Sequence, residues 1–362
     1  MAVTDAGEAR IAANPLRELA SGIDALYLSG RTAVAEAFLD ELEARKCDAQ
    51  EINGPMTVIV GGEEFGLLPY ALNRYRFRLS HPFGEIGITR SEHLPQIHVE
   101  PRAEFLHGLG AAEGAQWFME VLESEFGSIE WTVNRLDLFM DVQGWELDGD
   151  DRRNFVTQAR ARMLREEDDG FSGLQHGTRK AGTIHCRIYD KLRQIKAKGN
   201  DYWFGVWGDT FDPHNSVLRI EFEFARGGLR DFEVDSPADA LAKAGALWAA
   251  VTGDWLTHRT PTGDGTRSRW PLSPEWEFVQ KASVCGGAIG LDRVRAGKRA
   301  GSIRRKVPVF VGYLVDLATE FDATSLDGAL GIARALVEED ESRRDVQFAH
   351  RLEIARAERR YR

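Results

Sequence analysis

Apolar side chains recur along the first third of the chain at spacings that switch between the strand and helix periods. Residues 23–28 form an apolar run typical of a strand. Val34, Phe38 and Leu42 then fall on one face of a helix expected over 32–45. A second amphipathic helix is expected over 113–126. Between the two helices, the pattern predicts four strands, at 56–60, 74–80, 84–89 and 96–99.

The next part of the chain repeats this order of elements. The pattern predicts a long strand at 131–142, a helix at 151–165, strands at 183–189 and 217–224, and a helix at 237–251. Runs of consecutive strands with few intervening helices predict an α+β fold of mostly antiparallel sheets. Element order, without sequence identity, suggests two similarly organised strand and helix halves.

The last third of the chain is expected to be mostly helical. A segment rich in Thr, Gly and Pro at 257–274 predicts a loop or linker. Helical patterns follow at 275–283, 307–321 and 326–338, and 341–362 is a charged helix or tail. We therefore expect an N-terminal tail over 1–20, a main domain over 20–235 with halves of about 20–127 and 128–235, and a helical C-terminal region over 236–362.

Composition narrows the class of protein. Of 362 residues, 43% are hydrophobic and 28% charged, the balance of a soluble globular protein. No apolar run approaches the roughly 20 residues that a membrane-spanning helix needs, and the first residues do not resemble a secretory signal. Three widely spaced cysteines favour a reduced, cytoplasmic setting and argue against a Cys-rich zinc site.

The net charge of −11 counts against nucleic-acid binding if it is taken as an average. The distribution of charge differs from that average, because two segments are locally basic. Either segment is also compatible with an ordinary solvated face. The first comprises Arg179, Lys180, Arg187, Lys191, Arg193, Lys196 and Lys198, and the second Arg293, Arg295, Lys298, Arg299, Arg304, Arg305 and Lys306.

The strand expected at 131–142 carries the first candidate chemistry. Alternation places Arg135, Asp137 and Asp141 on one face and apolar residues on the other. Carboxylates are hard oxygen donors suited to Mg²⁺ or Mn²⁺. A salt-bridged polar face is the alternative interpretation. The strand expected at 217–224 has the same alternation.

In that second strand Arg219, Glu221 and Glu223 share the polar face. If the two strands pair with their polar faces aligned, as many as four carboxylates converge. Like charges at that separation are unfavourable without a cation, so a divalent metal is the natural partner. The alternative is an amphipathic edge strand.

A third cluster ends the strand expected at 183–189. Arg187 and Tyr189 share a face, and Asp190 and Lys191 follow. A tyrosine hydroxyl has an ordinary pKa near 10 and is a poor nucleophile at neutral pH. Neighbouring cations are expected to favour the phenolate and to offset charge on a phosphodiester. A packed tyrosine at a strand end is the structural alternative.

The ordered trio of clusters resembles the replication initiation factor family, which comprises trans-acting rolling-circle initiators of small plasmids and related relaxases of integrative elements. The matching residues lie within about 20–235. The resemblance implies Tyr189 as nucleophile, a divalent metal held by acidic residues, and a homodimer. The matching positions are Arg135, Asp137 and Asp141, then Gly177, Arg179, Arg187, Ile188, Tyr189, Asp190 and Lys191, then Arg219, Glu221 and Glu223.

We therefore expect an origin-specific DNA-nicking enzyme that starts rolling-circle replication through a 5′-phosphotyrosyl intermediate. Tyr189, Lys191 and Arg187 are the expected catalytic residues, and Asp137, Asp141, Glu221 and Glu223 the expected ligands of Mg²⁺ or Mn²⁺. The expected partner is an origin hairpin with its single-stranded nick region. The residues expected to bind DNA are Arg179, Lys180, Arg219, Arg74, Arg76 and Arg78.

Other interpretations remain open from sequence. A conjugative relaxase or a phage replication protein would use the same chemistry, and a DNA-binding regulator or a protein-interaction module would use none. The histidine pair of another nickase class is missing from the sequence. No G-x-x-x-x-G-K-[ST] run is present, so strand separation would fall to a host helicase. The sequence shows no convincing helix-turn-helix.

Overall fold

The computed structural model describes residues 15–167, 170–179, 183–285, 310–311, 314–315, 317–344 and 347–360. The chain divides into two compact units. Unit 1 comprises Met1–Leu26 and Val133–Ile289, and unit 2 comprises Tyr27–Thr132 and Gly290–Arg362. Helices expected at 237–251 and 275–283 therefore belong with the strands of unit 1. Among the described residues, no helix is long and apolar enough to cross a membrane.

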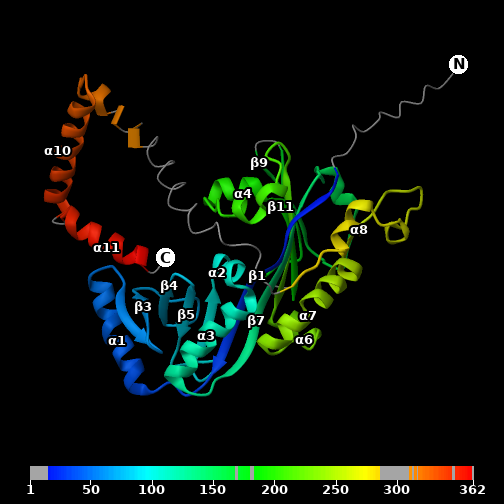
Figure 1. Cartoon of the computed structure of the whole chain (residues 1–362), viewed down its shortest axis with the longest axis horizontal. Helices are drawn as coiled ribbons and strands as arrows, with labels where there is room; N and C mark the ends of the chain where they lie inside the picture. Colours follow the sequence, from blue (N-terminus) through cyan, green and yellow to red (C-terminus); the bar gives the residue numbers. More distant parts are fainter. Residues whose placement is uncertain are drawn as a thin grey trace. The chain divides into compact units, whose positions relative to one another are not determined.

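Unit 2 is an antiparallel sheet with helices packed against it (Figure 1). Its strands lie in the order β2-β3-β4-β5-β6-β1, where only the C-terminal part of β1 belongs to this unit. Leu39 and Leu42 of α1 and Phe118 of α3 are buried in its core. The elements are β1 (Arg17–Arg31), α1 (Glu36–Glu51), β2 (Met56–Val60), β3 (Glu63–Leu68), β4 (Phe77–His81), β5 (Gly84–Ile88), β6 (Ile97–Pro101), α2 (Ala103–Leu109), α3 (Ala111–Phe126), α10 (Leu326–Arg344) and α11 (Phe348–Arg360).

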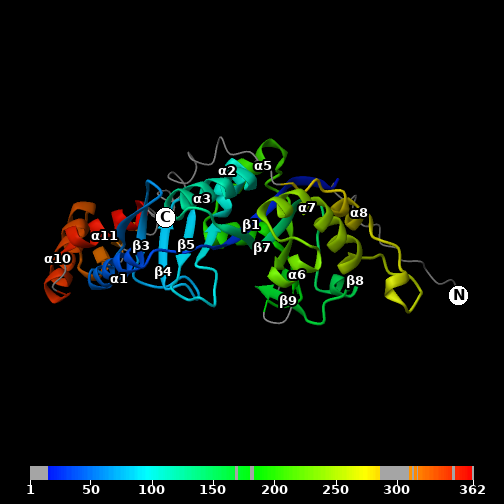
Figure 2. The ribbon, with the colours of Figure 1, turned by 90° about the horizontal axis from the view of Figure 1, so that it is seen from below.

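Unit 1 is built on strands in the order β7-β12-β11-β10-β9, all antiparallel. Helices α6 and α7 lie together on one face (Figure 2), where Phe222 of β12 contacts Trp248 of α7. Trp203 of α5 covers the other face. The elements are β7 (Glu130–Gln143), η1 (Asp150–Arg153), β8 (Phe155–Thr157), β9 (Arg162–Glu167), β10 (Gly170–His176), β11 (Ile184–Asp190), α4 (Lys191–Lys198), α5 (Trp203–Trp207), η2 (Gly208–Thr210), β12 (Val217–Ala225), α6 (Arg226–Asp231), α7 (Pro237–Ala250), η3 (Val251–Trp255), β13 (Leu256–His258), η4 (Arg267–Arg269) and α8 (Pro274–Gln280).

The two units share one plan. In each, a meander of antiparallel strands ends with a strand that returns beside the first one: β6 lies beside β1, and β12 beside β7. In each, helices follow that returning strand, α2 and α3 in unit 2 and α6 and α7 in unit 1. The predicted α+β fold of two similarly organised halves is therefore confirmed.

One predicted helix is wrong. Residues 151–165 form η1, β8 and the start of β9 instead of a helix. Leu164 pairs with Leu174 of β10, and Val156 with Thr257 of β13, so ladder hydrogen bonds override the helix propensity of the Arg, Met and Leu residues. The sequence reading also missed β3, which follows the turn at Gly61 and Gly62.

That turn yields a matched test of the fold. Gly61 and Gly62 both have positive φ, +57° and +85°. A Cβ on Gly61 would lie 2.1 Å from the carbonyl oxygen of Val121 in α3, whereas nothing lies within 4 Å of a Cβ on Gly62. We predict that Gly62→Ala lowers the free energy of unfolding by about 1 kcal/mol. Gly61→Ala should lower the free energy of unfolding clearly more, because the new Cβ can fit only if the backbone at Val121 or at the turn shifts.

Urea denaturation of the two variants measures this difference directly. Equal losses of unfolding free energy for Gly61→Ala and Gly62→Ala would show that Val121 of α3 does not pack against Gly61.

Candidate active site

Strand register brings the three predicted clusters of unit 1 onto one face. β12 pairs with β7 on one side and with β11 on the other. Arg219 therefore lies between Asp141 and Tyr189, and Glu221 lies opposite Arg187. Directly opposed residues of an antiparallel pair project to the same side. The pairing that the alternation left open is thus observed, with the polar faces aligned.

Arg219 is the buried centre of this face. Its side chain has 0% exposure, and its Nε and Nη2 donate to the two oxygens of Asp141 at 2.6 and 2.7 Å. Nη1 donates to Asp24 of β1 at 3.0 Å. The guanidinium lies 4.1 Å from the Phe139 ring and 4.0 Å from the Trp203 ring. The prediction that Arg219 binds DNA is wrong, because the side chain is sealed in protein.

Asp141 is likewise committed to the interior. Besides the two bonds from Arg219, it accepts a hydrogen bond from Trp207 Nε1 at 2.9 Å, and its exposure is 0%. A carboxylate that accepts three donors and faces no solvent is a structural anchor for the strands and α5. The geometry therefore removes Asp141 from the predicted set of metal ligands.

The other three carboxylates converge on one guanidinium nitrogen. Arg187 Nη2 hydrogen-bonds Glu221 Oε1 and lies 3.6 Å from Asp137 Oδ2 and 4.0 Å from Glu223 Oε2. All three carboxylates are buried. Arg187 Nε is also buried and finds no hydrogen-bond partner among the described residues. This group of one arginine and three carboxylates is called the acidic cluster below.

Two further arginines, Arg135 and Arg179, offset the negative charge of Asp137 and Glu223. Arg135 Nε donates to Asp137 Oδ1 at 2.7 Å, and its Nη2 lies 2.9 Å from Glu223 Oε2. Arg179, which is half exposed, donates to Glu223 at 2.9 Å. Burial raises the pKa of Asp137 to about 7, although the Arg135 guanidinium opposes the shift. Buried carboxylates thus gather here only because cations lie among them.

Whether this site could take a metal ion depends on its donors. Asp137, Glu221 and Glu223 offer the hard oxygens that Mg²⁺ and Mn²⁺ prefer, and they already surround one positive nitrogen. In the described part of the chain, no three His, Cys, Asp or Glu side chains stand in a geometry ready to hold a metal. The donor chemistry therefore fits a divalent cation, while Arg187 occupies the point where the carboxylates meet.

Tyr189 is a neutral tyrosine held against a carboxylate. Its hydroxyl donates to Glu221 Oε2 at 2.9 Å. Burial, followed by the charge of Glu221, raises the pKa of Tyr189 well above its ordinary value, and Arg219 and Arg187 only partly oppose this. The nearby cations act in the expected direction, towards the phenolate, but burial and Glu221 outweigh them. Glu221 is placed to accept the proton instead.

Lys191 is a buried lysine whose side chain contacts Trp203 and Gln194. It is the first residue of α4, is 2% exposed, and lies with Nζ 4.5 Å from the Trp203 ring. Nζ donates to Gln194 Oε1 at 2.8 Å, and Gln194 Nε2 lies 3.5 Å from the Tyr189 hydroxyl. Burial lowers the pKa of Lys191 to about 7, and the Arg219 charge adds to this. Lys191 therefore positions Gln194 and Tyr189.

The remaining residues predicted to bind DNA are not part of the candidate active site that the structure describes. Arg74, Arg76 and Arg78 belong to unit 2, and the strand expected at 74–80 begins only at Phe77. Arg76 pairs with Glu43, and Arg78 pairs with Glu85 at 2.9 Å. Lys180 and the basic segment 293–306 lie outside the described residues. DNA contact by these residues stays a prediction.

Sequence reasoning missed three contributors to the site. Asp24 binds Arg219 from β1, and its one signal was a single acidic residue inside an apolar strand. Gln194 and Trp203 come from α4 and α5 and carry no local motif. Asp190 caps α4 by accepting from the backbone N–H of Leu192 at 2.9 Å, and Trp207 ties α5 to the sheet through Asp141.

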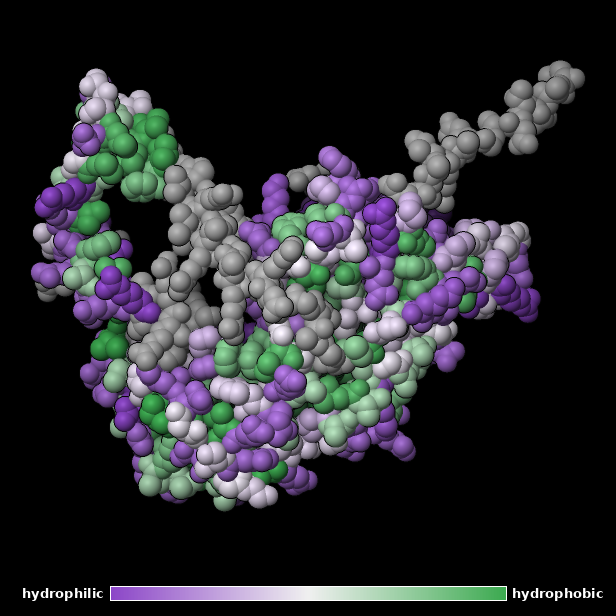
Figure 3. Space-filling view, viewed as in Figure 1, coloured by the Kyte–Doolittle hydropathy of each residue, from purple (hydrophilic) through white to green (hydrophobic). Residues whose placement is uncertain are grey.

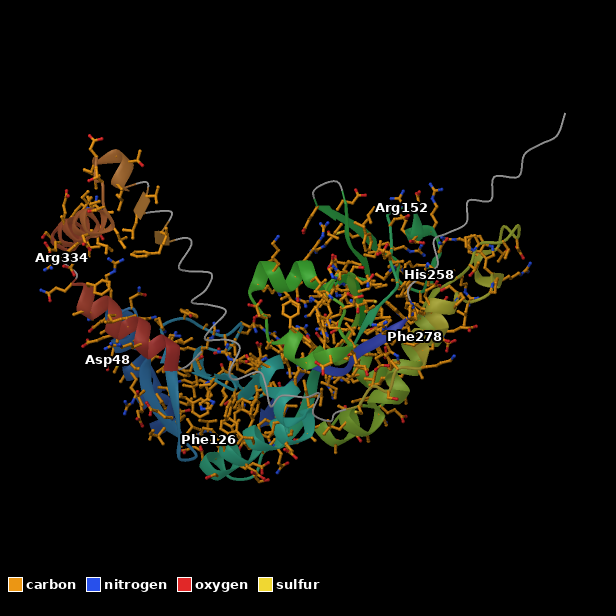
Figure 4. The ribbon with its side chains drawn as sticks, turned by 45° about the horizontal axis from the view of Figure 1, so that its top comes forward. Asp48, Phe126, Arg152, His258, Phe278 and Arg334 are labelled. Atoms are coloured by element: carbon orange, nitrogen blue, oxygen red, sulfur yellow. The ribbon has the colours of Figure 1, made fainter. Side chains whose placement is uncertain are left out.

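A second polar group on the opposite face of unit 1 is structural. His258 and its neighbourhood are visible in Figure 4, where Phe278 marks α8. His258 Nδ1 lies 2.8 Å from Ser273 Oγ and its Nε2 lies 3.8 Å from Asp151. Ser273 is buried and caps α8 by accepting from the backbone N–H of Trp276. A buried helix cap is not available as a nucleophile.

Comparison with known proteins yields one solved structure of note. No protein-family model matches the chain, and no curated protein matches it. The chain is similar to the rolling circle replication initiator protein from Geobacillus stearothermophilus, at 17% identity and a TM-score of 0.41, over 73% of this chain and 96% of that one. Similarity at that level does not establish a family, and what the site does follows from its own geometry.

The Arg219–Asp141 pair predicts a stability effect. Removing one partner of a buried ion pair leaves an uncompensated charge, which costs about 3–5 kcal/mol. We predict that Arg219→Met lowers the free energy of unfolding by about that amount. The matched control is Arg334→Ala, which breaks the exposed Arg334–Glu338 pair of α10 and should cost under about 1 kcal/mol.

Urea denaturation measures both losses. A loss within about 1 kcal/mol for Arg219→Met, similar to that of the control, would show that the pair does not anchor the sheet.

Proposed function

We propose that the chain is a DNA-nicking enzyme that initiates rolling-circle replication, with Tyr189 as its nucleophile. The observation that carries the proposal is the hydrogen bond from the Tyr189 hydroxyl to buried Glu221, beside the cationic Arg187. A nucleophile that donates to a base, which is itself oriented by a third group, is the arrangement of covalent catalysis. Tyr189 is half-buried, whereas its partner Glu221 is fully buried.

The proposed step balances as follows. Glu221 accepts the phenolic proton as the Tyr189 oxygen attacks a phosphodiester phosphorus. The Tyr189 O–P bond forms and the P–O3′ bond breaks. The leaving 3′ oxygen takes a proton from solvent and becomes a free 3′-OH. The 5′ end of the broken strand stays on Tyr189 as a phosphotyrosyl ester, and the 3′-OH can prime synthesis.

The surrounding cations suit a phosphodiester. Arg187 is hydrogen-bonded to Glu221 and therefore lies next to the attacking oxygen, where negative charge develops on the phosphate. Gln194 faces the Tyr189 hydroxyl from α4 and, through Lys191, keeps it oriented. Asp137, Glu221 and Glu223 would hold a Mg²⁺ or Mn²⁺ ion once the Arg187 guanidinium moves from the point where the three carboxylates meet. When bound, such an ion supplies further positive charge beside the phosphate.

The proposed setting follows from the products. An enzyme that leaves a primed 3′-OH needs a DNA origin, whose hairpin exposes a single-stranded nick region, and a separate host helicase to open the duplex. A homodimer in the cytoplasm completes the proposal, as the resemblance of the sequence motifs implies.

The nucleophile and its base give the first functional prediction. On supercoiled DNA that carries the sequence flanking its own gene, the wild type should produce nicked circles. Tyr189→Phe should abolish nicking, because no oxygen remains to attack. Glu221→Gln should slow it by about 10²–10⁴-fold, because the proton has no acceptor.

Gel electrophoresis of the nicked circles measures these rates. The control is Tyr70→Phe, an exposed tyrosine of unit 2, which should nick at the wild-type rate. Nicking by Tyr189→Phe at the wild-type rate would remove Tyr189 from the mechanism.

The metal proposal predicts direct binding as well as activity. In the uncleaving Tyr189→Phe background, Mn²⁺ titration followed by electron paramagnetic resonance should reveal one bound ion. Glu223→Gln should weaken that binding by about 10–100-fold. The control Glu43→Gln, which removes the exposed partner of Arg76, should leave the affinity unchanged. Unchanged Mn²⁺ affinity in Glu223→Gln would place the metal elsewhere.

A further inference from the structure

The outer strands of unit 1 continue the row of residues that contains Tyr189. Gly173 of β10 pairs with Tyr189, and Arg165 of β9 pairs with Gly173. The three residues lie side by side across the sheet and share the face of the candidate active site. Strands lie about 4.8 Å apart, so the Cα of Arg165 is roughly 10 Å from that of Tyr189.

Gly173 leaves this row open. A Cβ at that position would lie 2.9 Å from the carbonyl oxygen of Ile188 and 3.2 Å from the Tyr189 Cβ. The pairing of β10 with β9 shifts register between Phe171 and Gly173, a bulge beside Tyr189. Bulges of this kind often lie next to active sites, where they re-aim side chains. The backbone between Arg165 and Tyr189 is thus bare, without a side chain in the way.

Arg165 is available to a ligand. It is exposed, and within the described ranges it forms no ion pair. In Figure 3 hydrophilic residues gather over the part of unit 1 where β9 reaches the surface. The acid that shares its face of β9 is Glu167, and the Glu167 carbonyl accepts from Arg193 at 3.2 Å, which holds the end of the strand.

A second row runs beside the first. Met163 of β9 pairs with Gln175 of β10, and Gln175 pairs with Arg187. Met163 is 54% exposed, large for an apolar side chain in a strand. On this face β9 and β10 therefore present the cation of Arg165, the apolar side chain of Met163 and the amide of Gln175, next to the backbone of Gly173. Single-stranded nucleic acid is bound by this mixture of positive charge, apolar contact and hydrogen bonding.

We propose that β9 and β10 form the track along which a single DNA strand reaches Tyr189, with Arg165 binding a backbone phosphate near the scissile one. The track rests on the proposed function, and it assigns the substrate as single-stranded DNA lying across the strands. Gly173 permits the close approach of the backbone, and Met163 packs against a sugar or base.

The test compares two arginines of the same strand. Arg162 and Arg165 carry the same charge on β9, but Arg162 pairs with His176, on the face away from Tyr189. Binding of a short fluorescent single-stranded oligonucleotide of mixed sequence is measured by anisotropy over a salt series, in the Tyr189→Phe full chain. We expect Arg165→Ala to weaken binding roughly tenfold. It should also lower the slope of log affinity against log salt by about 0.7, the loss of one phosphate contact.

Arg162→Ala is expected to change neither the affinity nor the slope. Equal effects of the two variants, or no effect of Arg165→Ala, would overturn the track. The nicking assay separates this result from the function itself. If the wild type nicks DNA while the two variants bind alike, only the track fails. If Arg165-dependent binding is found in a protein that never nicks, only the proposed function fails.

Discussion

The buried guanidinium of Arg219 is the interaction on which the site depends. Two charges removed from water are costly unless nearly all of their hydrogen-bonding capacity is used. Here Asp141 accepts two bonds from Arg219 and one from Trp207, while Asp24 and two aromatic rings complete the surroundings of the guanidinium. A slip of one residue between β7 and β12 would break this arrangement. The register that it fixes is the register that sets Tyr189 and the acidic cluster side by side.

The same pairing bears on the electrostatics of Tyr189, the proposed nucleophile. Burial and the charge of Glu221 raise the pKa of Tyr189, and the charge of Arg219, which is paired with Asp141, opposes this only in part. A neutral tyrosine that acts as a nucleophile needs a base, and Glu221, two residues beyond Arg219 on the same face of β12, accepts its hydrogen bond. The site therefore favours proton transfer to a carboxylate over a preformed phenolate. In the proposed reaction Arg187, which is hydrogen-bonded to Glu221, is the arginine nearest the phosphate, a group that a guanidinium suits.

Much of the site could be predicted from alternation within single strands, because period-2 patterns assign faces without knowledge of partners. Asp137, Glu221 and Tyr189 were placed on polar faces in this way. Alternation could not distinguish Asp141, an anchor, from Asp137, a cluster member, since that depends on the residue opposite each one, Arg219 for Asp141 and Glu223 for Asp137. Asp24 comes from β1, far from the site in sequence, and Gln194, although only five residues from Tyr189, belongs to a helix without a recognisable motif. The helix expected at 151–165 failed because pairing with β10 and β13 overrode local propensity.

In the proposed reaction one defined oxygen, the Tyr189 hydroxyl, takes over the 5′ end of a broken strand. The direct measurement is mass spectrometry of the protein after incubation with Mn²⁺ and a pool of single-stranded oligonucleotides of randomised sequence, followed by proteolysis. If Tyr189 is the nucleophile, we expect a peptide containing Tyr189 with a nucleotide phosphate attached to its phenol. An adduct on another residue, or oligonucleotide cleavage with no adduct on the protein, would contradict it.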